Sequence, residues 1–160
     1  MPLTLDDLLK MPNRERLDVM KQGVAVDFDA VRNTQYLGID LSMPRWFNRL
    51  AWKTFRKTFV DDGAGGIRGW NVRMQQTGWD GPGKPILKGG KPLTFGHYLL
   101  RNGTGVAFPK RLNFPTYLDY WNAGNTALDV AKFTRSPLVA VNAGASDLLL
   151  GWEVFKVGPA

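Results

Sequence analysis

Glycine and proline divide this chain into short apolar runs, and this punctuation limits the folds that it can adopt. The 160 residues include 18 glycines and 10 prolines. From residue 52 onward they fall between runs of apolar and aromatic side chains, a pattern typical of short strands joined by turns. The spacing predicts a mainly β fold, an antiparallel sandwich or barrel. We predict strands near 52–60, 67–76, 92–102, 105–109, 115–121, 137–142 and 147–157.

Turn residues join several of these runs. Asp61–Gly66 links the first two, and Asn102-Gly103 is a hairpin dipeptide between the third and the fourth. Residues 78–92 form a long Gly/Pro loop of the kind that borders a binding mouth. One inserted helix is expected within 126–135, with Asn125 or Thr126 as its cap.

The first 50 residues follow a helical and irregular pattern instead. Thr4 is positioned to cap a short helix that stops near Pro12, and Asn13 is positioned to cap a second helix over 14–22. Residues 36–41 look like a strand, and 44–51 have helical spacing of apolar residues. We expect a single domain, 1–160, in which segment 1–50 packs on or plugs a barrel formed by 51–158.

Alternation along the strands predicts which side chains face inward. In 67–75 it places Trp70, Val72 and Met74 on one face, which we expect to be the interior. The strands 92–102 and 147–157 are apolar on both faces and need cover on both. A closed barrel wrapped on one side by short helices provides that cover.

Eight short motifs follow one another between residues 36 and 157: Tyr36-Leu-Gly38, Trp52-Lys-Thr-Phe55, Gly69-Trp70-Asn71-Val72, Gly96-His97-Tyr98, Leu118-Asp119-Tyr120, Gly124-Asn125, Pro137-Leu138-Val139 and Leu149-Leu-Gly151-Trp152. In this succession the chain resembles a bacterial family of small, uncharacterised proteins with a lipocalin-like barrel. The resemblance implies an antiparallel lipocalin-like β-barrel with a pocket for an apolar small molecule, and no established reaction. Such proteins are expected to continue into one more closing strand, so closure of the barrel stays open or depends on the N-terminal segment.

Several kinds of chemistry lack the residues that they need. The absence of cysteine excludes disulfides, zinc–thiolate sites and cysteine nucleophiles. His97 is the single histidine, and no serine lies in a G-x-S-x-G pattern, so neither a metal site nor a catalytic triad is expected. We predict no cofactor, although haem ligation through His97 alone stays open.

Nine residues are candidates for a site. If the barrel holds a ligand, we expect aromatic and apolar strand residues to line the cavity. These ligand-binding candidates are Trp70, Met74, Phe95, Tyr98, Trp121 and Trp152. If the barrel is an enzyme, the candidates for proton transfer are His97, Asp119 and Tyr120.

Both His97 and Asp119 also have structural interpretations. His97 shares a strand face with Phe95 and Leu99, so we favour a core histidine. Asp119 among aromatic residues would have a raised pKa if it pointed inward. We favour the alternative, in which Asp119 braces the turn that follows it at Asn122.

The net charge of +7 is unevenly distributed. The run 45–57 mixes cations with aromatic residues, a composition compatible with nucleic acid or an anionic membrane surface. Its aromatics are spaced to pack inward, so we favour a solvated basic face, and nucleic acid is not the expected partner.

The leading hypothesis is therefore that a β-barrel cavity binds an apolar small molecule or lipid. This ligand is either neutral or acidic. The alternative is a barrel enzyme of the isomerase or cyclase type, and the second alternative is a basic surface for nucleic acid or anionic lipid. No window approaches the length of a membrane span, and we expect a cytoplasmic protein. Edge strands of an incompletely closed barrel allow a homodimer.

Overall fold

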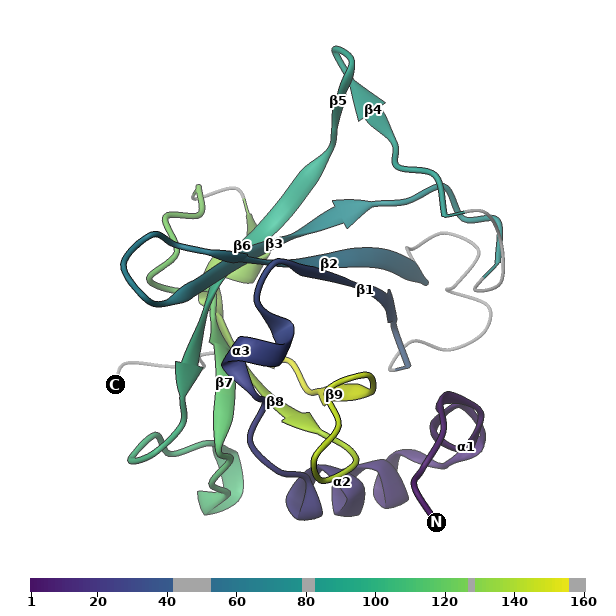
Figure 1. The fold of residues 1–160 in the computed structure, drawn as a ribbon, viewed down its shortest axis with the longest axis vertical. Coiled ribbons are helices and arrows are strands. Elements are labelled where there is room, and N and C mark those ends of the chain that lie inside the picture. Colours follow the sequence, from purple (N-terminus) through teal and green to yellow (C-terminus); the bar gives the residue numbers. More distant parts are fainter. Residues whose placement is uncertain (42–52, 79–82, 127–128, 156–160) are drawn as a thin grey trace.

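A single antiparallel sheet of eight strands dominates the molecule and curls into a half-barrel (Figure 1). The computed structural model describes residues 1–41, 53–78, 83–126 and 129–155. The strand order is β1-β2-β3-β6-β7-β8-β10, and β9 also pairs with β8. The mainly β, antiparallel prediction is confirmed. The strands are β1 (Thr34–Ile39), β2 (Thr54–Asp61), β3 (Ile67–Arg73), β6 (Thr94–Asn102), β7 (Thr116–Asp119), β8 (Thr134–Ala140), β9 (Leu149–Gly151) and β10 (Val154–Phe155).

Two predicted strands have a different structure. Residues 105–109 form no strand, and Asn102 pairs with Thr116 of β7 instead of opening a tight hairpin. The predicted strand 147–157 is divided into β9 and β10 at Trp152. Since Pro137 of β8 has no N–H to donate, the ladder opposite this break lacks one hydrogen bond, and Trp152 N–H donates to the Pro137 carbonyl.

The long Gly/Pro loop contains a small hairpin of its own. It consists of β4 (Leu87–Lys88) and β5 (Lys91–Pro92), joined at Gly89-Gly90, and it extends away from the main sheet (Figure 1). Residues 79–82 of the same loop lie outside the described residues.

Short helices accompany the sheet: α1 (Leu5–Lys10), α2 (Asn13–Gln22), α3 (Phe28–Val31) and the 3-10 turns η2 (Pro109–Arg111) and η3 (Val130–Phe133). Thr4 and Asp7 form the predicted capping box of α1. The prediction that Asn13 caps α2 is wrong, because the cap position is Pro12 and the Asn13 side chain accepts from Arg16. In the described part of the chain, no helix has the length and apolar character needed to cross a bilayer.

The predicted helix within 126–135 is confirmed only in part, as a short 3-10 turn. Its described part is limited to the turn η3, and β8 begins at Thr134. Asp129 caps η3 by accepting from Ala131 N–H, and Thr134 is a β-branched residue suited to a strand. The predicted helix 44–51 lies outside the described residues.

The inner face of the curled sheet carries the first hydrophobic cluster. Its aromatic rings meet edge to face: the centroid of Phe59 lies 5.6 Å from Tyr36 and 5.5 Å from Tyr98, and Tyr98 lies 5.4 Å from Tyr120. Such pairs stabilise beyond the burial of their surface. The buried members of this inner cluster are Val26, Val31, Phe59, Ile67, Tyr98, Leu100, Leu118, Tyr120 and Leu138.

The opposite face of β7 and β8 carries a second cluster, packed against α1 and α2. Leu8 and Met20 from these helices are 2% and 1% exposed. Adjacent residues such as Leu138 and Val139 belong to different clusters because successive side chains of a strand point to opposite faces. The outer cluster consists of Leu8, Met20, Phe108, Phe114, Tyr117, Val139 and Leu150.

The prediction for the faces of β3 is confirmed only in part: Val72 and Met74 are buried, at 5% and 3%, but they do not belong to the inner cluster. Gly69 and Asn71 face the inner cluster, whereas Trp70 lies on the outer face beside His97. A Cβ at Gly69 would approach the Tyr98 ring to 2.5 Å, so the inward position has to be glycine. On the inner side of β3, Ile67 is thus the one apolar side chain, and Gly69 and Asn71 follow it where pattern analysis looks for further apolar residues.

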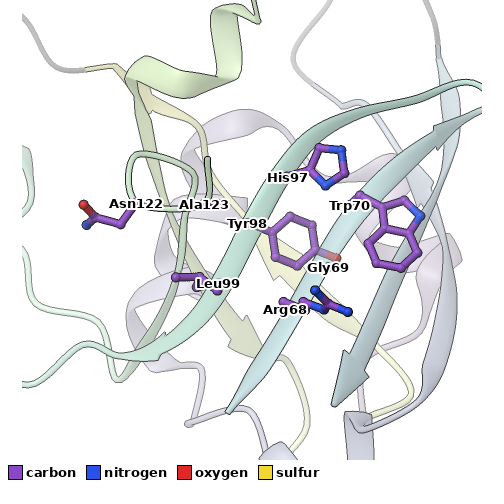
Figure 2. Close-up of a pocket in the computed structure, with 8 residues that line it drawn as sticks. All are labelled: Arg68, Gly69, Trp70, His97, Tyr98, Leu99, Asn122 and Ala123. Atoms are coloured by element: carbon purple, nitrogen blue, oxygen red, sulfur yellow. The ribbon is translucent and has the colours of Figure 1, made fainter. Parts of the chain in front are cut away.

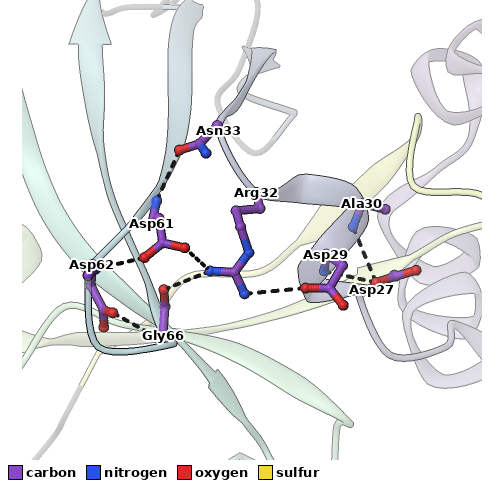
Figure 3. Close-up of polar contacts among 9 residues, drawn as sticks. Asp27, Asp29, Ala30, Arg32, Asn33, Asp61, Asp62 and Gly66 are labelled. Carbon is purple, nitrogen blue, oxygen red and sulfur yellow. Dashed lines mark hydrogen bonds and ion pairs between the residues drawn. The ribbon is translucent and has the colours of Figure 1, made fainter.

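A polar cluster joins α3 to the turn between β2 and β3 (Figure 3). The Arg32 guanidinium donates to Asp61, to Asp29 and to the Gly66 carbonyl. Asn33 accepts from Asp61 N–H on the same side. These bonds hold the start of β1 against the far end of the β2–β3 hairpin.

Candidate functional site

Lys57 lies on the inner face of β2 between two phenylalanines. The alternation of β2 points Phe55, Lys57 and Phe59 to the same side. Lys57 is paired with Tyr36 of β1 and with Asn71 of β3, and paired residues of antiparallel strands project from the same face. The register of three strands therefore places an amine on an otherwise apolar surface.

Three side chains surround the Lys57 amine, from β3, from β6 and from the residue that follows β7. Nζ donates to Asn71 Oδ1 at 2.9 Å and lies 3.1 Å from the Tyr120 hydroxyl. It also lies 4.4 Å from the centroid of the Tyr98 ring, within the range of a cation–π contact. We call Lys57, Asn71, Tyr98 and Tyr120 the lysine centre.

Buried backbone contacts fix the partners of the lysine. Asn71 Nδ2 donates to the Gly96 carbonyl at 3.3 Å, which turns its Oδ1 toward the amine. Gly96 has a φ of +53°, and a Cβ there would approach Asn71 Nδ2 to 2.8 Å. The Tyr98 hydroxyl donates to the Thr58 carbonyl. The absence of a side chain at Gly96 and the carbonyl groups of Gly96 and Thr58 thus hold Asn71 and Tyr98 in one arrangement.

Burial dominates the electrostatics of the centre. It lowers the pKa of Lys57 to about 7, although the nearby charge of Glu153 opposes this shift. Burial also raises the pKa of Tyr120, so that the phenol keeps its proton. Among the described residues, no carboxylate lies within ion-pair distance of Lys57. The centre therefore holds an amine that is charged and neutral in similar amounts near pH 7.

Along the strands, the inner face changes from a closed core to an accessible surface. Phe59 and Tyr98 are 0% and 1% exposed, whereas Phe55, Lys57 and Phe95 are all partly exposed. Beyond them the guanidinium of Arg73 lies 5.7 Å from the Phe95 ring. The accessible part of the face thus combines aromatic rings with cations.

His97 lies on the outer face, away from the lysine centre. Its side chain is exposed, so the prediction of a core histidine is wrong. The imidazole lies 6.0 Å from the Trp70 ring, centroid to centroid, at the border of a shallow hollow of about 370 Å³ (Figure 2). The hollow is lined by Arg68, Gly69, Trp70, His97, Tyr98, Leu99, Asn122 and Ala123.

Asp119 has the structural role that the sequence favoured. It is 2% exposed, and its carboxylate accepts from the backbone N–H groups of Trp121 and Asn122. It also accepts from Asn122 Nδ2 at 2.7 Å. No hydrogen bond or ion pair within the described ranges joins Asp119 to His97. Of the three proton-transfer candidates, Tyr120 alone belongs to the lysine centre.

The structure does not gather the six ligand-binding candidates around one site. Tyr98 and Phe95 lie on the inner face, and Trp70 lies on the outer face. Met74 is buried at 3% and bridges to Pro85. Trp121 packs under the guanidinium of Arg135, and Trp152 is 41% exposed.

Sequence reasoning missed Lys57 and Asn71. The signal was present in TFRKTFV, where one lysine takes the inward position between two phenylalanines in strict alternation. A cation at that position is expected to cost stability, and such a cost indicates a possible functional residue. Within the described ranges, no three side chains of His, Asp or Glu are grouped as metal ligands.

The sequence and the structure were also compared with known proteins. No family model matches this chain, and no match is found among the curated proteins or the solved structures. The resemblance to lipocalin-like bacterial proteins therefore stays a prediction, and the lysine centre is the feature that bears most directly on function.

Proposed function

We propose that the inner face of the curled sheet binds an apolar small molecule that carries a carboxylate, with Lys57 as its counter-ion. One observation carries this proposal. A lysine amine lies among aromatic rings, and no described carboxylate is close enough to form an ion pair with it. A cation that is largely surrounded by apolar side chains is usually paired, so a partly buried lysine with no described ion-pair partner is a candidate binding group.

A bound carboxylate would supply what the lysine centre lacks. Asn71 Oδ1 and the Tyr120 hydroxyl leave the amine one further direction for donation, since an ammonium group has three N–H donors. A carboxylate beside Nζ would favour the charged amine and offset its desolvation. The partly exposed rings of Phe55 and Phe95 provide apolar surface for the remainder of such a ligand.

The two other functions considered from the sequence have less support. Proton transfer by His97 and Asp119 lacks a shared geometry, because Asp119 is engaged in its own turn. Binding of nucleic acid through residues 45–57 stays a prediction, since most of that run lies outside the described residues.

Decanoate and decan-1-ol are suitable probes because they differ in charge and share an alkyl chain. Calorimetry at pH 6.5 should show that decanoate binds at least about tenfold more tightly, since a hydrogen bond to a charged group contributes about 1.5–3 kcal/mol. Lys57→Met should remove this preference and leave the weak binding of the alcohol. Affinity for decanoate should fall as the pH rises from 7 to 9, because the free amine loses its proton near pH 7.

Lys53→Met is the matched control, because Lys53 is close in sequence and is not part of the lysine centre. That variant should keep the preference for decanoate. Equal binding of acid and alcohol by the unmodified chain would refute the proposal, and so would loss of the preference in both variants.

A further inference from the structure

We infer that Lys57 is also a nucleophile: its amine condenses with the carbonyl group of an apolar aldehyde, and Tyr120 supplies the proton. This inference rests on the proposed function, because the aldehyde would occupy the same inner face as the carboxylate. It adds covalent chemistry to a site that otherwise only binds.

The geometry holds the amine in a position suited to such a reaction. Asn71 and Tyr120 approach Nζ from β3 and from the end of β7, so the flexible lysine side chain is held by two partners on separate elements. The Tyr98 ring covers one side of the amine at 4.4 Å. The phenol of Tyr120, 3.1 Å from Nζ, is also within reach of an oxygen atom bonded to the carbon under attack.

The lowered pKa of the Lys57 amine favours the same chemistry. Only a neutral amine attacks a carbonyl group, and burial lowers the pKa of Lys57 to about 7. At pH 7 the neutral fraction of Lys57 is therefore far larger than that of an ordinary lysine, which is on the order of one in a thousand.

The other titratable groups near Lys57 are Glu153, Tyr36, Tyr98 and Tyr120. Glu153 raises the pKa of the amine without forming an ion pair with it. The three tyrosines have raised pKa values, in each case chiefly because of burial, and they stay neutral. Arg73, paired with Phe55, lies on the same face.

The reaction balances without an oxidant or a metal. The Nζ lone pair forms a bond to the carbonyl carbon, and the carbonyl π electrons move to oxygen, which takes the Tyr120 proton. The nitrogen then returns a proton to the phenolate, which gives a neutral carbinolamine. The nitrogen lone pair next expels the hydroxyl group, which leaves as water with one proton drawn from solvent through Tyr120. The products are a protonated imine at Lys57 and one water molecule.

Trapping with cyanoborohydride tests this inference. The full chain is incubated with decanal and cyanoborohydride at pH 7, and the decylated lysines are located by peptide mass spectrometry. Lys57 should be labelled at least about tenfold faster than the chain's other lysines, because its neutral fraction is larger. Its labelling rate should rise with pH and level off above pH 7, whereas rates at other lysines should continue to rise past pH 9. Uniform labelling of all lysines would overturn the inference.

Two variants separate chemistry from folding. Tyr120→Phe keeps the ring and should slow labelling of Lys57 at least about tenfold, a size typical of a lost proton donor. Tyr117→Phe, in the outer cluster, should leave the rate unchanged. An unchanged rate in Tyr120→Phe would remove Tyr120 from the mechanism.

Binding of decanoate distinguishes the two proposals. If decanoate binds and slows labelling but Lys57 shows no preference for decanal over other lysines, the nucleophile inference fails and the proposed function stands. If Lys57 is labelled selectively and decanoate neither binds nor competes, the proposed function fails.

Discussion

At the scale of single residues, Lys57 connects binding to stability. Its amine lies on the inner face, where burial opposes its charge. In the unfolded chain the same amine is hydrated and keeps the ordinary pKa of a lysine, 10.5. Between these two pKa values the unfolded state binds more protons than the folded state, so stability depends on pH in this range.

The sign of this dependence follows from the lowered pKa. Stability should rise with pH from about 7 to about 10.5, because folding in this range releases the proton of the Lys57 amine, and that release costs less free energy as the pH rises. The contribution should be on the order of 1–2 kcal/mol, since the partly exposed side chain keeps some hydration. Urea unfolding at pH 6.5, 8 and 9 measures it as the difference between the unmodified chain and Lys57→Met. Lys53→Met should show no such difference; a flat difference for Lys57→Met would contradict the placement of the amine.

Part of the site was predictable at this scale. Tyr120 was identified as a candidate, and the turn-bracing role favoured for Asp119 is confirmed. Lys57 was assigned to a solvated basic face, because charge is normally outside and the inner side of β3 gave no contrary signal. The inward positions there are Gly69 and Asn71, whose roles depend on Tyr98 and Lys57 in other strands. Pattern analysis of one strand does not contain that information.

At the scale of elements, Arg32 couples α3 to the β2–β3 hairpin (Figure 3). The pKa of Asp61 is lowered, first by the N–H of Gly63 and then by Arg32. A carboxylate with a lowered folded-state pKa stabilises the fold above its unfolded pKa, and this stabilisation is lost as the pH falls through the folded value.

Asp61→Asn should therefore lower the melting temperature at pH 7 and have a smaller effect near pH 2, because protonation of the carboxylate weakens the ion pair as the pH falls. Thermal unfolding at the two pH values measures this difference. Asp18→Asn removes an exposed ion pair with Lys21 in α2 and should have a small effect at both pH values. An Asp61→Asn effect that is as large at pH 2 as at pH 7 would argue against the ion pair as its source.

Regular elements were easier to predict than connections. The strands β2, β3 and β6 follow from short apolar runs and from their flanking turns, and α1 follows from its capping box. The loop 103–115 was predicted as a hairpin and a strand. Its conformation depends on Phe108 and Phe114, which are buried in the outer cluster against residues distant in the sequence. The segment around η3 was predicted as a longer helix. There the Asp129 side chain accepts from Gly96 N–H of β6, a long-range contact that the local sequence pattern does not indicate.

At the scale of the whole molecule, two hydrophobic clusters share the strands β7 and β8. Leu118 and Leu138 lie on one side, and Tyr117 and Val139 lie on the other. The helices α1 and α2 pack in the outer cluster, and the segment after α2 is joined to the sheet by the Val24–Ala140 bridge. Shared strands should make the two clusters unfold together.

Met20→Ala tests this coupling from the outer cluster. The change should cost about 2–5 kcal/mol, the usual range for a buried methionine truncated to alanine. Native-state hydrogen exchange should show faster exchange at the amides of β2 and β3 as well as at those near α2. Leu118→Ala, from the inner cluster, should give the same distribution. Acceleration confined to one cluster would show that the clusters unfold separately.

The free edge of β6 beside the lysine centre has a consequence for assembly. At residues 96 and 97, two side chains take the place of a neighbouring strand: Asp129 accepts from Gly96 N–H, and Asn125 both accepts from His97 N–H and donates to the His97 carbonyl. A strand from another copy of the chain would find these backbone groups already satisfied. The amide of Asn125 and the carboxylate of Asp129 therefore oppose β-pairing with another chain. They do so in the part of β6 that precedes Leu99, where its pairing with β7 begins.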